Sequence, residues 1–427
     1  MTGQLTFEVQ IDQNEYLPAG GRTMDAAISV TCGAGGGLGG PPPTAAQVVM
    51  IDCSTSMSGT KLAEAKRATG VAIDTLRDDV AFAVISGTSS ARVIYPPKAG
   101  ALVPASAATR AQAKEAVRGL RAHDGTAIGT WLALADRLLD GHPARIKHAI
   151  LLTDGRNQHQ TEAEFRRDLE RCRGHFVCDS RGVGTEWEAA PLLAIAETLL
   201  GSASGLTEPD RLAADFQAVT EAVMGKAVAD VSLRLWTPAD TKIRFLKQVH
   251  PVIVDLTERG TPAGGERTRD YPTGQWGEET KDFHLSVEVP AGLIGDERAA
   301  ARVSVAVGER ELAERTVWIH WTDDLVLSTR INPQVAHYTG QIELAETIQE
   351  GLAARAKGEV DVANAKLGRA VQLATESGNH ETVKVLAKVV EVVDAVQGTV
   401  RLRHQMEAVD AELAGLQSRR TIRTRNG

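Results

Sequence analysis

Residues 48–62 read VVMIDCSTSMSGTKL. An apolar run in this stretch ends at Asp52, and the hydroxyl residues Ser54 and Ser56 follow at alternate positions in a DxSxS pattern. A short apolar run between polar turns is typical of a strand that is buried on both faces of a sheet. The stretch therefore predicts a buried strand whose carboxyl end carries oxygen-bearing side chains.

Three further apolar runs share this pattern within residues 46–225. They lie at 81–85, 149–152 and 176–178, and segments with apolar residues at helical spacing separate them. Strands that alternate with helices predict an α/β fold, in which a mostly parallel sheet has helices on both faces.

A different pattern precedes and follows this region. Apolar and polar residues alternate by two at 5–11 and 28–32, and again between 229 and 321, which predicts antiparallel strands with one buried face. Because the early strands have no partners inside an α/β domain, we expect them to complete the later strands as a β-sandwich. The α/β domain would then be an insertion, joined through the Gly/Pro-rich connection GAGGGLGGPPPT at 33–44.

The last part of the chain is helical by its apolar spacing and predicts a C-terminal helical bundle. We expect this bundle to be a docking module outside the α/β core, with a possible second partner on its helices, and the basic end SRRTIRTRNG to be frayed. The expected divisions are 1–45 (strands and linker), 46–225 (α/β domain), 226–325 (sandwich), 335–418 (helices) and 419–427 (basic tail).

Composition limits the possible partners and compartments. The 427 residues exceed one ordinary domain of about 100 to 200 residues, and 55 acidic against 47 basic residues give no electrostatic reason to expect nucleic acid. The first residues lack a signal-peptide pattern and no later segment reaches membrane-spanning length, so we expect a cytoplasmic protein with no membrane span. Cysteines 32, 53, 172 and 178 have no CxxC pairing and are expected to be reduced and structural.

Two more loops carry oxygen-bearing side chains near strand ends. Asp154 closes the run AILLTDG, and Thr126 begins a helix in HDGTAIG. The carboxyl ends of parallel strands meet at one edge of a sheet, so these residues should lie close to Asp52, Ser54 and Ser56. A set of hydroxyl and carboxylate oxygens favours Mg²⁺ or Mn²⁺. If the hydroxyls bind directly and the carboxylates through water, the metal keeps a position for an incoming carboxylate.

Residues 46–225 resemble a Rossmann-like von Willebrand factor A (VWA) domain. The DxSxS pattern at 52–56, Gly125 with Thr126, and TDG at 153–155 are similar to the three loops of its metal-ion-dependent adhesion site (MIDAS). RGVGTEW at 181–187, followed by a helix rich in leucine and alanine, is similar to its last strand and helix. The resemblance implies binding of a protein partner through an Asp or Glu at the metal, without enzymatic activity. It covers about two-fifths of the chain. The flanking regions are similar to those of some intracellular bacterial VWA proteins, which are associated with kinase, phosphatase or ATPase regulators.

The same residues have other interpretations, which the sequence supports less well. Ser56 or Ser58 alone could simply cap a helix that begins near Thr60, but three loops with complementary oxygens favour a metal site. Aspartyl phosphatases place an acid where this chain has Ser54, SGTKL lacks the GxxxxGK[ST] pattern, and no histidine motif accompanies SGTSSA at 86–91. The loop histidines His123 and His159 are expected to be solvated.

The leading hypothesis is therefore a metal-dependent protein-binding scaffold. The alternative is a non-catalytic regulatory subunit of an ATPase/chaperone-type or kinase/phosphatase signalling assembly. A metal-dependent hydrolase is a third possibility. Carboxylates bound directly to the metal, or a basic residue above it, would favour hydrolysis, and the sequence offers neither clearly.

Overall fold

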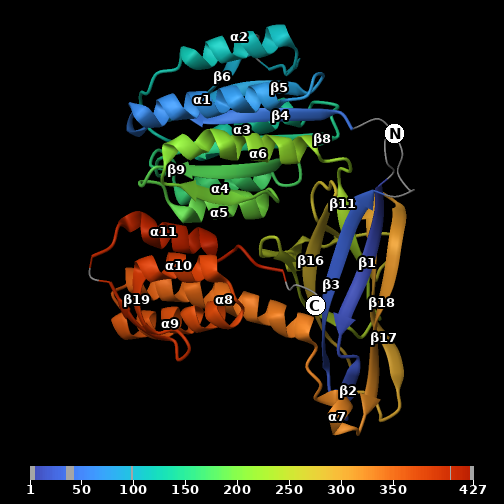
Figure 1. The fold of residues 1–427 in the computed structure, drawn as a ribbon. Coiled ribbons are helices and arrows are strands. Elements are labelled where there is room, and N and C mark those ends of the chain that lie inside the picture. The colour runs from blue at the N-terminus through green and yellow to red at the C-terminus, as the bar shows by residue number, and fades with distance from the viewer. Residues whose placement is uncertain (1–4, 35–42, 98–99, 404, 424–427) are drawn as a thin grey trace. The chain divides into compact units, whose positions relative to one another are not determined.

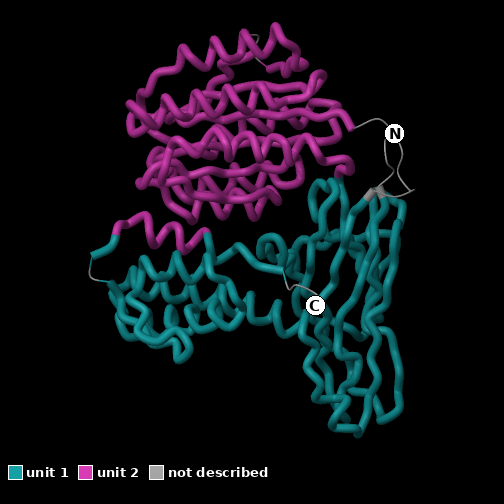
Figure 2. Tube along the Cα trace, viewed as in Figure 1, with its two compact units in different colours: residues 1–40, 230–406, 417–427 teal, residues 41–229, 407–416 magenta. Residues whose placement is uncertain are grey.

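The computed structural model describes residues 5–34, 43–97, 100–403 and 405–423. The chain divides into two compact units, and each contains segments that are distant in sequence (Figure 2). One unit comprises 41–229 and 407–416; the other comprises 1–40, 230–406 and 417–427. Most of the expected Gly/Pro-rich connection, residues 35–42, lies outside the described residues.

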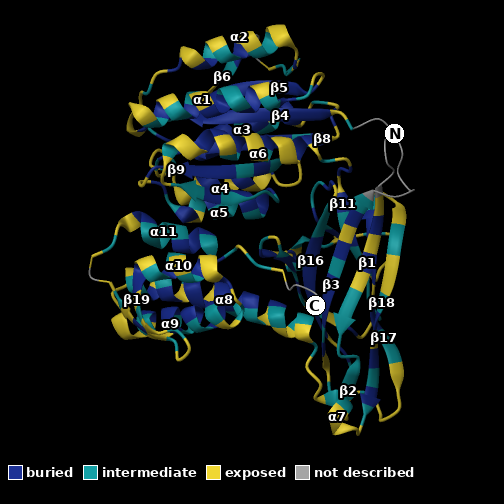
Figure 3. Ribbon diagram, viewed as in Figure 1, coloured by how far each residue is buried: buried dark blue, intermediate teal, exposed yellow. Residues whose placement is uncertain are grey.

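The first unit contains the predicted α/β sheet, with strand order β10-β9-β8-β4-β5-β6 and β7 also paired with β5. Strand β4 is parallel to both β5 and β8, whereas β6 and β7 are antiparallel to β5. The strands are β4 (Ala45–Asp52), β5 (Ala81–Gly87), β6 (Ala91–Tyr95), β7 (Val103–Pro104), β8 (Ile146–Thr153), β9 (Val177–Val183) and β10 (Ala203–Leu206). Every residue of β4 is buried, as its apolar run predicts (Figure 3).

Alternate residues of a strand point to opposite sides of the sheet, and the apolar residues of β4 lie on both sides. Helices therefore cover both faces of this sheet. Val49 and Ile51 of β4 share a core with α1, α2 and α6, and Val48 and Met50 share another with α3, α4 and α5 (Figure 1). The helices are α1 (Thr60–Thr75), α2 (Ala107–Arg118), α3 (Ile128–Leu139), α4 (Glu162–Arg171), α5 (Ala189–Thr198) and α6 (Leu212–Met224). The segment RGVGTEW contains the end of β9 and leads to α5, but β10 and α6 follow, so it does not mark the last strand and helix.

The second unit contains two sheets, with strand orders β1-β3-β16-β12-β13 and β14-β15-β11-β17-β18-β2. Their pairings are antiparallel except that of β2 with β18. The strands are β1 (Leu5–Gln13), β2 (Tyr16–Pro18), β3 (Thr23–Ala34), β11 (Val231–Trp236), β12 (Lys242–His250), β13 (Val254–Asp255), β14 (Thr261–Pro262), β15 (Thr268–Pro272), β16 (Glu279–Glu288), β17 (Glu297–Val307) and β18 (Arg310–Thr322). Strand β3 pairs with β16, so the sequence of the α/β unit lies between two strands that are neighbours in one sheet.

The region from 325 is mostly helical but includes a hairpin that the apolar spacing did not predict. Its elements are α7 (Leu325–Ser328), α8 (Pro333–Ala356), α9 (Val360–Glu376), α10 (His380–Val389), β19 (Val390–Asp394), β20 (Thr399–Leu402) and α11 (Ala408–Gln417). Valines 390, 392 and 393 favour a strand over a helix. Gly398 has φ +64° at the turn, and a Cβ there would lie 2.7 Å from the Gly368 carbonyl oxygen of α9. The expectation that the ordered elements of 335–418 are all helices is therefore wrong at this hairpin.

Helix α11 belongs to the α/β unit, contrary to the expectation of a separate helical module. Val409 and Leu416 are buried in the same core as Leu192 of α5, and Leu413 packs against it. The Glu412 Oε2 atom accepts a hydrogen bond of 2.6 Å from the backbone N–H of Ala189, the first residue of α5. The α/β unit thus takes one of its core helices from the C-terminal region.

The described residues of the basic tail make specific contacts, so the expectation of a frayed end fails for them. The Ile253 N–H donates to the Arg419 carbonyl at 2.8 Å, and His337 Nε2 donates to the Ile422 carbonyl at 2.8 Å. Arg423 Nε donates at 3.0 Å to the fully buried carboxylate of Asp282. Backbone pairing and one buried charge hold this segment. Within the described ranges, no helix is both long and apolar enough to cross a membrane.

Candidate functional site

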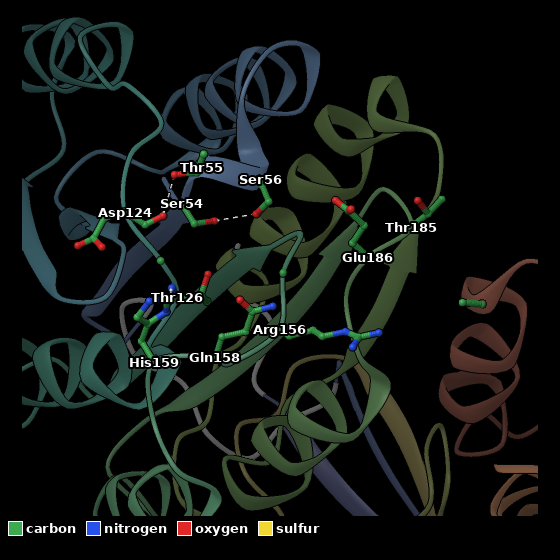
Figure 4. Close-up of a pocket in the computed structure, with 13 residues that line it drawn as sticks. Ser54, Thr55, Ser56, Asp124, Thr126, Arg156, Gln158, His159, Thr185 and Glu186 are labelled. Atoms are coloured by element: carbon green, nitrogen blue, oxygen red, sulfur yellow. Dashed lines mark hydrogen bonds between the residues drawn. The ribbon is translucent and has the colours of Figure 1, made fainter.

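A pocket opens at the carboxyl ends of β4, β8 and β9, where the three predicted loops come together (Figure 4). The loops follow β4, precede α3 and follow β8. The side chains of these loops direct oxygen and nitrogen atoms into the pocket. The residues that line it are Ser54, Thr55, Ser56, Asp124, Gly125, Thr126, Gly155, Arg156, Gln158, His159, Thr185, Glu186 and Ala408.

Asp52 ties the first loop to the end of β8. Its Oδ1 accepts a hydrogen bond of 2.7 Å from the Ser54 N–H, and its Oδ2 accepts one of 2.5 Å from Thr153 Oγ1. Burial raises the pKa of Asp52 to about 6. The hydrogen bonds lower the pKa, but their effect is smaller than that of burial. The carboxylate therefore lies beneath the pocket and orients the DxSxS loop rather than lining the hollow.

The hydroxyl groups lie above Asp52 and face one another. Ser54 Oγ and Ser56 Oγ are 3.0 Å apart, and Ser56 Oγ donates at 2.7 Å to Asp154 Oδ1. A Cβ atom built on Gly155 would be 3.4 Å from both Ser56 Oγ and Thr126 Oγ1, so the third loop closes over these oxygens without a side chain of its own. The structure thus brings the five residues predicted from sequence into one site.

This donor set fits a hard divalent cation. Ser54 Oγ and Ser56 Oγ form a hydrogen bond of 3.0 Å, and together with Thr126 Oγ1 they offer neutral oxygens of the kind that Mg²⁺ and Mn²⁺ accept. Across the described part of the chain, no group of three or more His, Cys, Asp and Glu side chains could hold a metal. The candidate site thus consists of facing hydroxyl oxygens with two carboxylates behind them, which is a hard donor set.

A clamp from the loop after β8 holds the Thr126 loop in place. The His159 N–H donates to the Thr126 carbonyl at 2.9 Å, and the Thr126 N–H donates to His159 Nδ1 at 3.2 Å. Asn157 Oδ1 and Gln160 Oε1 accept from the first two N–H groups of α3, each at 2.9 Å. His159 is exposed, as expected for a loop histidine, but its ring also accepts a hydrogen bond from the Thr126 N–H. The Thr126 backbone that His159 contacts lies in another loop, so sequence spacing does not reveal the pair. The local sign of such a contact was Ala127 at the N-cap of α3, because alanine has no side-chain oxygen to cap the helix.

Lys61 is a site residue that the sequence analysis missed. Its Nζ lies 2.6 Å from Asp154 Oδ2 and 2.8 Å from Glu186 Oε2. Burial lowers the pKa of Lys61, but its hydrogen bonds to the two carboxylates outweigh burial and leave the pKa above its ordinary value. The second position of a helix is unfavourable for a cation because of the helix dipole. A lysine directly after Thr60 was therefore a sequence signal for a nearby anion.

The four cysteines are buried and form no disulfide, as expected. Burial raises the pKa of both Cys53 and Cys172 to about 12 and holds that of Cys178 well above its usual value. Thiols with such pKa values are poor nucleophiles and poor metal ligands at neutral pH.

Comparisons with known proteins identify the family. A model of the von Willebrand factor type A domain matches residues 46–204, and a model of the von Willebrand factor type A C-terminal domain matches residues 372–414. The structure of a von Willebrand factor type A protein from Catenulispora acidiphila is 46% identical, covers 99% of each chain and superposes with a TM-score of 0.93. The chain belongs to the von Willebrand factor type A family.

Two further relatives of this VWA protein are more distant. The ArnB paralog VWA2 from Sulfolobus acidocaldarius is 12% identical, with 97% of this chain and 98% of that chain covered and a TM-score of 0.59, so the two share a fold. A protein from Synechocystis sp. is 28% identical over 240 residues, which are 53% of this chain and 54% of the relative. The chain thus spans about half the length of the curated relative it matches.

Proposed function

We propose that this VWA protein binds a protein partner through a divalent metal at the five-residue site, with an Asp or Glu of the partner completing the metal's coordination. The observation that carries this proposal is the set of facing hydroxyl oxygens from Ser54, Ser56 and Thr126 in an open pocket. Neutral hydroxyl donors would leave a bound Mg²⁺ or Mn²⁺ with much of its charge, and an anionic partner group compensates it.

The chain's own residues divide the work of such a site. Ser54, Ser56 and Thr126 would hold the metal directly. Asp154 fixes the Ser56 hydroxyl by its 2.7 Å hydrogen bond, and Asp52 fixes the loop backbone through Ser54. When bound, the metal supplies an electrophilic position that accepts a carboxylate.

We further propose that the chain is not an enzyme. The nearest thiol, that of Cys53, has its pKa raised to about 12 by burial, so it does not supply a nucleophile at neutral pH. A hydrolase would need a basic residue near the metal, and Lys61 is the candidate. Two carboxylates stabilise the protonated form of Lys61, so it does not offer the neutral amine that general-base catalysis needs.

In this proposal the two sheets of the second unit form a β-sandwich that carries the α/β unit as an insertion, and helices α8–α10 offer a second protein surface. The partner is a cytoplasmic protein with an accessible Asp or Glu. Neither nucleic acid nor a membrane is proposed as a ligand. The alternative is a non-catalytic regulatory subunit of an ATPase/chaperone-type or kinase/phosphatase signalling assembly. In that alternative the captured partner is a component of the assembly.

The test is selection of displayed peptides on the immobilised chain in Mn²⁺ and in chelator. Selected peptides should contain Asp or Glu, lose binding when that residue becomes Gln or Asn, and release in chelator. Asp154→Ala and Ser54→Ala should lose capture, whereas Ser58→Ala, whose hydroxyl bonds the Thr55 carbonyl in the same loop, should keep it. Capture that survives chelator and both site variants would place binding elsewhere on the chain.

A further inference from the structure

Both oxygens of the Asp154 carboxylate are engaged by this chain's own side chains. Oδ1 accepts from Ser56 Oγ, and Oδ2 lies 2.6 Å from the Lys61 ammonium. The Asp154 side chain is 0% exposed, so Lys61 supplies the charge that compensates it. An uncompensated carboxylate at that depth would be costly.

Lys61 has a second carboxylate within reach at the edge of the pocket. Glu186 Oε2 lies 2.8 Å from the same ammonium, on a side chain that is 64% exposed. The Lys61 side chain is itself 23% exposed, and its Cε would be 3.1 Å from a Cβ built on Gly184. The ammonium therefore lies between one buried and one solvated carboxylate, and the absence of a side chain on Gly184 leaves room for it.

We infer that Lys61 is a resident cation that competes with the metal for Asp154, and that Glu186 holds the ammonium when the metal is present. This inference rests on the proposed function. A divalent cation near Asp154 is repelled by an ammonium 2.6 Å from the same carboxylate. Glu186 relieves that repulsion because it offers the ammonium a second partner. Lys61 thus lets the loops fold without metal and lowers the affinity of the site for it.

The two residues have opposite predicted effects, which separates this role from a purely structural one. Loss of the Lys61 charge should tighten Mn²⁺ binding on the order of tenfold. Loss of the Glu186 charge should weaken it several-fold, because the ammonium then has Asp154 alone. If the contacts were only structural, both changes would loosen the site and weaken metal binding.

The experiment is calorimetric titration of the full chain with Mn²⁺, for wild type, Lys61→Met, Lys61→Gln and Glu186→Gln. Lys61→Gln keeps a hydrogen-bond donor and should fold if the methionine variant does not. Lys66→Met is the matched control, because Lys66 lies on the same helix and bonds the Arg118 and Leu120 carbonyls. Without metal, both Lys61 variants should melt at a lower temperature than wild type, and Mn²⁺ should raise their melting temperatures more than that of wild type.

Equal Mn²⁺ affinity in wild type and the Lys61 variants would overturn the inference and leave the proposed function standing. Weaker binding in the Lys61 variants would overturn it as well. Failure of every chain, wild type included, to bind Mn²⁺ would overturn both.

Discussion

His159 and Thr126 exchange two hydrogen bonds across loops that lie 33 residues apart. These two hydrogen bonds fix the Thr126 backbone and therefore the position of its hydroxyl group. The imidazole ring of His159 lies directly against Gly125 in this arrangement. A proposed metal ligand, Thr126, is thus positioned by a residue that does not belong to the sequence motif.

We predict that Gly125→Ala weakens metal binding about 10- to 100-fold, the range for loss of a group that orients a ligand. The new Cβ would be 1.8 Å from His159 Cε1, so the ring and the Thr126 loop must separate. Calorimetric titration with Mn²⁺ measures the change. Gly141→Ala is the control, because nothing lies within 4 Å of a Cβ there. Unchanged affinity in Gly125→Ala would show that Thr126 does not need the clamp.

Metal should stabilise the chain in proportion to its occupancy. At a free Mn²⁺ concentration about 100 times the dissociation constant, the expected gain is about 2.7 kcal/mol. Thermal melts in Mn²⁺ and in chelator check this, and Asp154→Ala should remove the difference. A melting shift of the same size in Asp154→Ala would locate metal binding outside the five-residue site.

Glu412→Ala should destabilise the α/β unit by about 1 kcal/mol, because α5 loses the acceptor for its first N–H and an acid at its positive end. Glu412→Gln retains an acceptor and should cost less. Denaturant unfolding, followed by a probe in the α/β unit, gives both values. Equal costs for the two variants would mean that the contact acts through packing alone.

The stability of the second unit should fall on mild acidification. Burial lowers the pKa of His250, with the charges of Arg423 and His337 adding to this effect and Asp282 opposing it. Below the ordinary value of 6.5, the unfolded chain then binds more protons than the folded chain, so stability decreases as pH falls through this window. Melts from about pH 7.5 to about pH 5.5 should show a shallower slope for His250→Gln. His123→Gln, in a loop of the other unit, should keep the wild-type slope.

The α/β sheet and the site residues could be predicted because their signals are local. Each buried strand is an uninterrupted apolar run, and Asp52, Ser54 and Ser56 lie within five consecutive positions. Thr126 and Asp154 add the other two loops, and the topology of a parallel sheet brings all three to one edge.

The remaining features depend on partners that sequence spacing does not reveal. Lys61 meets a carboxylate 93 residues away, and His159 meets a backbone 33 residues away. Residues 383, 386, 390 and 393 match a helical period, yet the β-branched valines from 390 onward form a strand. Likewise, the apolar positions of α11 predict a buried face without showing which core receives it.

Helix α11 also affects the order in which the protein can be completed during synthesis. The α/β unit has nearly all of its core once residue 229 has been made, but Val409 and Leu416 follow only after the sheets and helices of the second unit. Until the ribosome reaches them, the apolar surface beside α5 stays uncovered, and chaperones and proteases recognise such surfaces. We therefore expect a chain that stops short of α11 to expose apolar surface on the unit that carries the candidate metal site, even when its earlier parts have folded.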